Sequence, residues 1–222
     1  MIQSSTLQFL KNLKKNNRKD WFDANRHKYL DAKADFEAFT TEIINRLGRI
    51  DESIAHLEAR PSTFRQHRDV RFSKDKSPFK VHMGMYLSKG GRKSFHAGYY
   101  FHLEPGNSLA GGGLWVPMAP ELKKVRQEID YNWDEFKGIL QNKKFRSVYG
   151  ELESGTDVKL TRPPKGYETD NPAIEYLKLK SLLATRKIPD AEVTAKDLAK
   201  KVADYFGALA PLVVFFNRAM ED

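Results

Sequence analysis

The apolar and polar positions of the first fifty residues follow the spacing of α-helices. A short helix is predicted to start at Ser4 or Ser5, either of which can cap it, and to carry Leu7, Leu10 and Leu13 on one side. A long helix is predicted to begin with Asp20 as its cap and to end at Gly48. Its apolar stripe consists of Phe22, Tyr29, Ala32, Phe36, Phe39, Ile43 and Leu47.

Between residues 63 and 116 the apolar positions recur at every second residue, which is typical of β-strands. A first strand is predicted over residues 63–72. The clearest pattern predicts a hairpin over residues 81–103, which turns at the glycine-bearing segment 89–93. A further, glycine-rich strand is predicted over residues 109–115.

The remainder of the chain is predicted to be mainly helical, with an edge strand over residues 181–188. A final helix is predicted to start at Thr194, and Pro211 is expected to kink or break it. Helices on both sides of a run of strands indicate an α+β fold. We therefore expect one domain over residues 1–222, with a central antiparallel sheet whose strands lie mainly within 63–116. Helices from the N- and C-terminal thirds are expected to pack on this sheet.

The two faces of the predicted hairpin differ in chemistry. Opposed residues of an antiparallel pair share a face, so one face is apolar and the other gathers polar aromatic side chains. The polar face holds His82, Tyr86, His96, Tyr100 and His102, with Gly84 and Gly98. Three histidines suit zinc, but this face offers no carboxylate and no ligand pair at helical spacing. Hydrogen-bonded or exposed histidines are therefore favoured over a metal site, and we predict neither a metal nor a cofactor.

The run of glycines in the strand at 109–115 removes the side chains from its middle. Such a run indicates that a ligand or another backbone comes close to the strand. It lacks the spacing of a nucleotide-binding loop, so it is a stronger indication of close packing than of phosphate binding. Gly112 is nevertheless a candidate ligand contact.

Positive charge is concentrated in the middle of the chain. Nine Lys and Arg and two Asp lie between Arg65 and Leu103, so this segment carries +7 of the net charge of +9. Phe72 and Phe79 flank much of this charge, which is unusual for a solvated charged surface and suits cations held for phosphate or carboxylate recognition. The candidate ligand-binding residues are Arg65, Arg68, Arg71, Lys74, Lys76, Lys80, His82, Tyr100 and Gly112.

Three functions are consistent with this pattern. The first is binding of an anionic small molecule on or beside the sheet, and an enzyme of this type would use Asp69, His96 or His102 for proton transfer. The second is binding of nucleic acid along an open cationic surface. The third is a scaffold in which Arg and Asp residues pair structurally, and for Asp69 an ion pair that orients an arginine is favoured over proton transfer.

Three motifs, in this order, resemble those of the domain of unknown function 2461 family. They are Asn-Arg-Lys-Asp-Trp-Phe at 17–22, Arg-Asp-Val-Arg-Phe-Ser-Lys-Asp-Lys-Ser-Pro-Phe-Lys at 68–80, and Gly-Gly-Gly-Leu-Trp at 111–115. The resemblance extends over nearly the whole chain. It implies no established reaction or ligand.

The composition narrows the cellular setting. The chain has no cysteine, which removes disulfides and thiolate chemistry and fits a reducing compartment. Its N-terminus does not read as a secretory signal, and no apolar run reaches membrane-spanning length. We therefore expect a cytoplasmic protein without a membrane partner; the pattern gives no indication of its oligomeric state.

Overall fold

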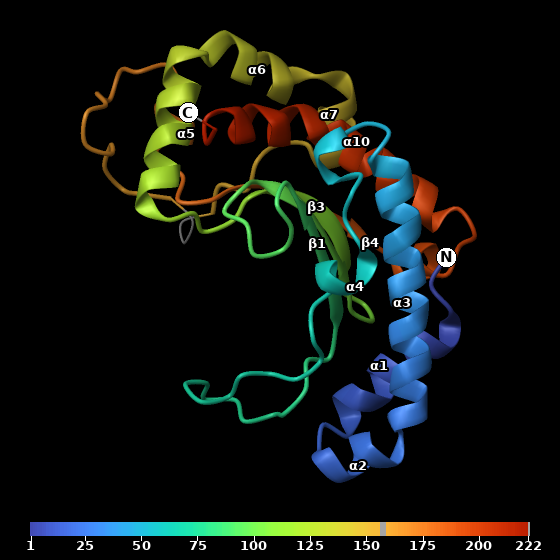
Figure 1. Ribbon diagram of the computed structural model, residues 1–222. Helices are drawn as coiled ribbons and strands as arrows, with labels where there is room; N and C mark the ends of the chain where they lie inside the picture. Colours follow the sequence, from blue (N-terminus) through green and yellow to red (C-terminus); the bar gives the residue numbers. More distant parts are fainter. Residues whose placement is uncertain (156–158, 222) are drawn as a thin grey trace.

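Four antiparallel strands form a sheet in the order β1-β2-β3-β4 in a computed structural model that describes residues 1–155 and 159–221 (Figure 1). The strands are β1 (Met83–Ser88), β2 (Gly98–Leu103), β3 (Ser108–Leu114) and β4 (Leu182–Ile188). The predicted hairpin is confirmed, and Tyr86 lies opposite Tyr100 in its register. The predicted edge strand is also confirmed, because β4 lies at the end of the sheet and, within the described residues, pairs only with β3.

The helices that precede the sheet are α1 (Ser4–Lys15), α2 (Lys19–Ala24), α3 (Arg26–Leu47), the 3₁₀ turn η1 (Glu52–Ile54) and α4 (Ala59–Ser62). The prediction of one helix from Asp20 to Gly48 is wrong at its start, because the chain breaks at Asn25 between α2 and α3. The Asn25 side chain donates to Trp21 O at 2.9 Å, a local hydrogen bond of the kind that competes with helix continuation. The predicted end is confirmed, since Gly48 caps α3.

The helices that follow β3 are α5 (Ala119–Tyr131), α6 (Trp133–Gln141), α7 (Lys143–Tyr149), α8 (Ile174–Leu177), α9 (Asp190–Val193) and α10 (Leu198–Arg218). The predicted start of the last helix is wrong, because Thr194 ends α9 and α10 begins after Asp197. The helix also continues through Pro211. Leu209, Leu212 and Val213 are almost fully buried around this proline, so tertiary packing holds the helix together.

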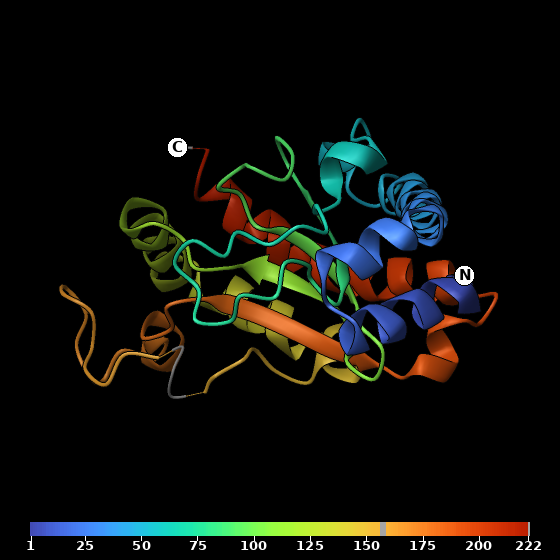
Figure 2. The same ribbon diagram turned by 90° about the horizontal axis from the view of Figure 1, so that it is seen from below.

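One face of the sheet carries the main core. Helix α10 lies across β3 and against α3 on this face, as Figures 1 and 2 show. Phe206 of α10 packs on Tyr99 with ring centroids 5.4 Å apart, and Phe39 of α3 packs on Phe101 at 5.0 Å. The helices of both ends of the chain therefore pack on the sheet, and the α+β fold is confirmed. Within residues 1–155 and 159–221, no helix is both long and apolar enough to cross a membrane.

The segment from residue 63 to residue 80 is not the predicted strand. It touches the edge of β1 through the single bridge Thr63↔Met85, and it then folds back on itself through the bridge His67↔Phe79. The tip of the fold, residues 69–77, projects as a long loop (Figure 1). Phe72, the last residue of the predicted strand, is accordingly not packed in the core and is 96% exposed.

Candidate functional site

Most cations of the loop at 69–77 and of its base form ion pairs or hydrogen bonds with other residues of the same loop. Arg71 donates to both carboxylate oxygens of Asp69, through Nε at 3.0 Å and Nη2 at 2.7 Å. Arg68 makes a short ion pair with Asp75. The hydrogen bonds from Arg71 lower the pKa of Asp69, which makes this carboxylate a poor proton acceptor. The predicted ion pair of Asp69 is confirmed.

The other two predicted cations of this loop, Lys74 and Lys76, are exposed. Lys76 donates to Val70 O at 3.0 Å. Two of the candidate ligand-binding residues, Arg68 and Arg71, are therefore already paired with acidic side chains of the same loop.

The base of the loop is held by the first motif of the chain. The Asn17 amide donates to Phe79 O at 2.9 Å, and Asn17 Oδ1 accepts from Phe79 N at 3.1 Å. The ring of Phe22 stacks on that of Phe79, with centroids 3.9 Å apart and planes 12° apart. The first and second motifs, which lie almost fifty residues apart in the sequence, therefore form one contact.

A different set of cations gathers around Phe64. Lys80 Nζ lies 5.2 Å from the centroid of the Phe64 ring, and Arg92 Cζ lies 4.8 Å from it. Burial, followed by the nearby charges of Arg65 and Arg92, lowers the pKa of Lys80. Of the predicted cations, Arg65 and Lys80 therefore come together, joined by Arg92.

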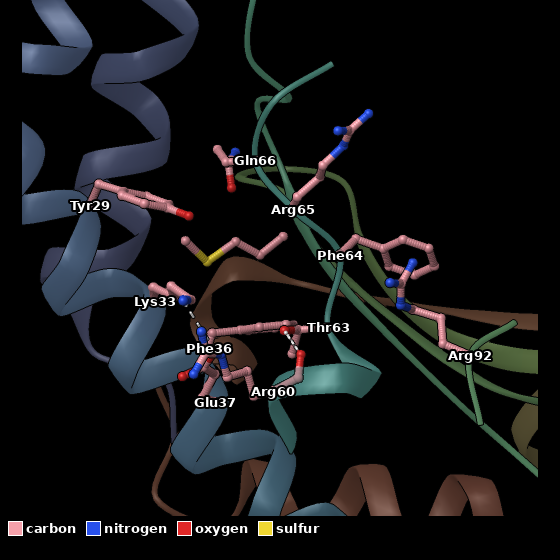
Figure 3. Close-up of a pocket in the computed structure, with 11 residues that line it drawn as sticks. Tyr29, Lys33, Phe36, Glu37, Arg60, Thr63, Phe64, Arg65, Gln66 and Arg92 are labelled. Atoms are coloured by element: carbon pink, nitrogen blue, oxygen red, sulfur yellow. Dashed lines mark hydrogen bonds and ion pairs between the residues drawn. The ribbon is translucent and has the colours of Figure 1, made fainter. Parts of the chain in front are cut away.

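Beside Phe64 lies a pocket of about 220 Å³ between α3 and the chain that follows α4 (Figure 3). Its apolar walls come from Tyr29, Phe36, Phe64 and Met83. Its charged groups are Lys33, Glu37, Arg60, Arg65 and Arg92. Figure 3 shows the hydroxyl of Tyr29 pointing into the pocket from α3, while Arg92 lies against Phe64 on the opposite side.

The charges of this pocket are unequal. Among the described residues, Glu37 is the one acidic residue that lines it, and Lys33 Nζ lies 3.6 Å from Glu37 Oε1. That buried oxygen has no hydrogen-bond partner among the described residues. No ion pair among the described residues involves the four neighbouring cations Arg60, Arg65, Lys80 and Arg92.

A second cluster lies on the polar face of the hairpin, where Tyr100, His102 and Glu104 form a chain of hydrogen bonds. Tyr100 Oη lies 2.8 Å from His102 Nδ1, and His102 Nε2 lies 3.2 Å from Glu104 Oε2. The ring of His82 lies beside that of His102, with centroids 4.3 Å apart. Gly84 leaves room for this arrangement, since an added Cβ would lie 3.1 Å from Tyr100 Oη.

The environment of this cluster shifts three pKa values. Burial, with smaller contributions from His102 and Lys80, lowers the pKa of His82 to about 4, and burial raises that of Tyr100 to about 12. Burial alone would raise the pKa of Glu104, but hydrogen bonds from His102, Asn107 and Lys14 outweigh it and lower that pKa. Near neutral pH the cluster therefore holds a neutral His82, a neutral Tyr100 and an ionised Glu104.

Two predicted residues lie apart from both groups. His96 precedes β2 while His102 lies near its far end, roughly 20 Å away at the usual rise of a strand. Its Nδ1 lies 2.6 Å from Ser94 Oγ. Gly112 is buried in β3, where a Cβ would lie 2.1 Å from Gly98 O and 2.9 Å from Leu209 Cδ2. The close neighbours of the glycine run are thus the adjacent strands and α10.

Glu104 is the residue that the sequence analysis missed on the hairpin. It lies two residues beyond His102, so extending the alternation past the end of the strand would have placed it on the same face and contradicted the expectation that this face lacks a carboxylate. Lys33 on α3 and Arg60 on α4 were also missed, because both precede the charged segment that starts at Arg65. Nothing in the local pattern connects them with Arg65.

Comparison with family models finds a match over residues 5–215 with a model described as conserved hypothetical protein (DUF2461). Comparison with curated proteins and with solved structures finds no match. The matched range contains all three motifs on which the resemblance was based, including the pair that meets at Asn17, Phe22 and Phe79. The chain belongs to the DUF2461 family.

Proposed function

We propose that this protein binds a small anion, bearing phosphate or carboxylate, in the pocket beside Phe64. The observation that supports this most strongly is the set of arginines without ion-pair partners among the described residues, namely Arg60, Arg65 and Arg92, at the pocket of about 220 Å³. Guanidinium groups bind phosphate and carboxylate through paired hydrogen bonds. Lys80, close to the same aromatic ring, adds charge at the edge of the site.

The pocket also favours an anion that carries a hydrogen-bond donor. Glu37 Oε1 is buried without a hydrogen-bond partner among the described residues, and such an atom is costly unless a ligand or water satisfies it. A hydroxyl or amino group on the ligand would donate to this oxygen. Small hydroxylated phosphates and carboxylates fit both requirements.

The proposal is for binding and not for a reaction. The hydroxyl of Thr63, which lines the pocket, donates to Arg60 O at 3.1 Å and is therefore not paired with a general base. His102, one of the candidates for proton transfer, is hydrogen-bonded to Tyr100 and Glu104 on the hairpin face.

Arg65→Gln is expected to weaken binding of glycerol 3-phosphate about 10- to 100-fold. The reason is the loss of a charged hydrogen bond, which contributes about 1.5–3 kcal/mol. Isothermal titration calorimetry on the wild-type protein and the variant measures the change. Inorganic phosphate is expected to bind more weakly than glycerol 3-phosphate, because it has no hydroxyl-bearing carbon chain to reach Glu37.

Arg71→Gln is the matched control for this experiment. It removes the same charge from an arginine that is already paired with Asp69 outside the pocket, so the affinity is expected to stay within about twofold. Equal losses in both variants would indicate a diffuse electrostatic effect and contradict a site at Arg65. The absence of binding to wild-type protein at low salt would remove the proposal.

A second candidate function, binding of single-stranded nucleic acid by the loop at 69–77, is favoured by one observation. Phe72 in this loop is 96% exposed, and Arg71 Cζ lies 5.8 Å from its ring centroid. An exposed aromatic ring among cations is the arrangement on which bases stack.

Phe72→Ala is expected to weaken binding of a short single-stranded RNA about 5- to 100-fold if this loop is the interface, because stacking contributes about 1–3 kcal/mol per base. Fluorescence anisotropy at several salt concentrations measures the affinity and its salt dependence. Arg65→Gln, which lies outside the loop, is expected to change RNA affinity little. RNA binding that is equal in wild-type protein and Phe72→Ala would exclude the loop as the interface.

A further inference from the structure

His82, His102 and Glu104 place three potential metal ligands close together. One ligand atom from each residue lies within 4.8 Å of the others. The side chains of His102 and Glu104 are only 14% and 15% exposed, so this is a sheltered cluster and not a solvated group of charges.

The spacing within this cluster suits a tetrahedral metal ion. Two ligand atoms that each lie about 2.1 Å from zinc at the tetrahedral angle are roughly 3.4 Å apart. His102 Nε2 and Glu104 Oε2 are 3.2 Å apart. An ion could therefore replace their hydrogen bond with little movement of either side chain, and a rotation of the His82 ring would bring in the third ligand.

Tyr100 supplies the support that such a ligand needs. Its hydroxyl lies 2.8 Å from His102 Nδ1, the ring nitrogen that faces away from Glu104. When a metal ion takes the place of the Nε2–H···Glu104 hydrogen bond, the ring proton is carried on Nδ1 and donated to this oxygen, so that Nε2 presents its lone pair to the ion. An outer hydrogen bond of this kind fixes the tautomer and orientation of histidine ligands.

The surrounding charge determines what else the ion would bind. Lys14 Nζ lies 3.4 Å from the second oxygen of Glu104, and Lys80 and Arg68 act electrostatically on His82. A divalent ion with one carboxylate ligand keeps a charge of +1, to which these cations add. The remaining coordination position therefore favours an anionic ligand.

We propose that His82, His102 and Glu104 form a binding site for one divalent transition-metal ion of the zinc type. The sequence disfavoured a metal because no carboxylate was assigned to this face of the hairpin, and Glu104 supplies it. The proposed site stands on its own geometry and does not depend on anion binding in the pocket beside Phe64.

The test uses the full-length, tag-free protein after removal of metal with a chelator. Zinc is titrated in competition with a chromophoric chelator, and cobalt is added separately to record the visible spectrum. We expect one zinc ion per chain and the intense absorption of four- or five-coordinate cobalt. His82→Ala and Glu104→Gln are each expected to weaken zinc binding at least about 10-fold, and Tyr100→Phe about 10-fold through the outer hydrogen bond.

His96→Ala is the matched control, because it removes a histidine that precedes the start of β2, away from His102, and it is expected to leave zinc affinity unchanged. A wild-type protein that binds no zinc, or zinc binding that His82→Ala and Glu104→Gln leave intact, would overturn the proposal. If a variant does not fold, the cobalt spectrum of the wild-type protein decides, since the weak spectrum of aqueous cobalt contradicts the site.

Discussion

Gly112→Ala is expected to destabilise the protein by about 3 kcal/mol or more, at the upper end of the cost of overpacking a core. The added Cβ would lie 2.1 Å from Gly98 O and 2.9 Å from Leu209 Cδ2. The nearer of these atoms belongs to the backbone of β2, so it cannot move away without disturbing the pairing of β2 and β3. Thermal and urea unfolding followed by circular dichroism measure the loss, which at this chain length corresponds to roughly 6–12 °C in Tm.

Gly138→Ala is the matched control for this substitution. Gly138 is exposed within α6, and among the described residues no atom outside its own helix backbone and its chain neighbours lies within 4 Å of the position that its Cβ would occupy. Alanine is a better helix former than glycine, so this variant is expected to gain about 0.5–1 kcal/mol. If Gly112→Ala melted as the wild-type protein does, the close approach of β2 to this glycine would be contradicted.

The glycine run allowed a close approach to this strand to be predicted from the sequence, but it did not identify the element that approaches. A strand without side chains implies that something approaches it, which the pattern at 109–115 conveyed correctly. Which partner approaches depends on the order of the strands and on the position of α10. Leu209 lies almost one hundred residues beyond Gly112, and nothing near the glycines indicates it.

The hairpin shows how far alternation alone can lead. Met85 and Phe101 are buried on one face while Tyr100 and His102 are partly exposed on the other, as the pattern of every second residue predicted. This succeeded because burial of one face sets the register of a strand pair. If the alternation is continued beyond Leu103, Glu104 falls on the same face as His102. The carboxylate of the proposed metal site could therefore have been predicted from the sequence.

The charged segment shows where alternation fails. Between Thr63 and Phe72 the pattern resembled a strand, yet only Thr63 pairs with β1. Further along, hydrogen bonds between near neighbours, such as Arg71 with Asp69 and Ser77 with Asp75, stabilise turns that compete with a ladder. Cations that are paired in this way are less available to a ligand. A count of charges along the sequence does not show which cations are paired.

Phe22→Ala is expected to reduce the free energy of unfolding by about 3–5 kcal/mol, the usual cost of removing a buried phenylalanine. Phe22 is 3% exposed, and its ring stacks on that of Phe79. The centroid of its ring also lies 4.9 Å from that of Tyr29. Because Phe79 closes the base of the loop at 69–77, the same substitution is expected to loosen that loop. Urea unfolding measures the first effect, and limited trypsin digestion at low temperature measures the second, since the loop contains Arg71, Lys74 and Lys76.

Phe145→Ala separates the two effects. Phe145 is fully buried in α7, which lies at the opposite end of the molecule from α2 (Figure 1), and its removal is expected to lower global stability by a similar amount. Trypsin is expected to cut the loop faster in Phe22→Ala than in Phe145→Ala, because only the former removes a contact that holds the loop in the folded protein. Equal rates of cleavage in the two variants would mean that the loop is held independently of Phe22. In that case Asn17, which binds both backbone polar groups of Phe79, would be the contact through which the first motif holds the second.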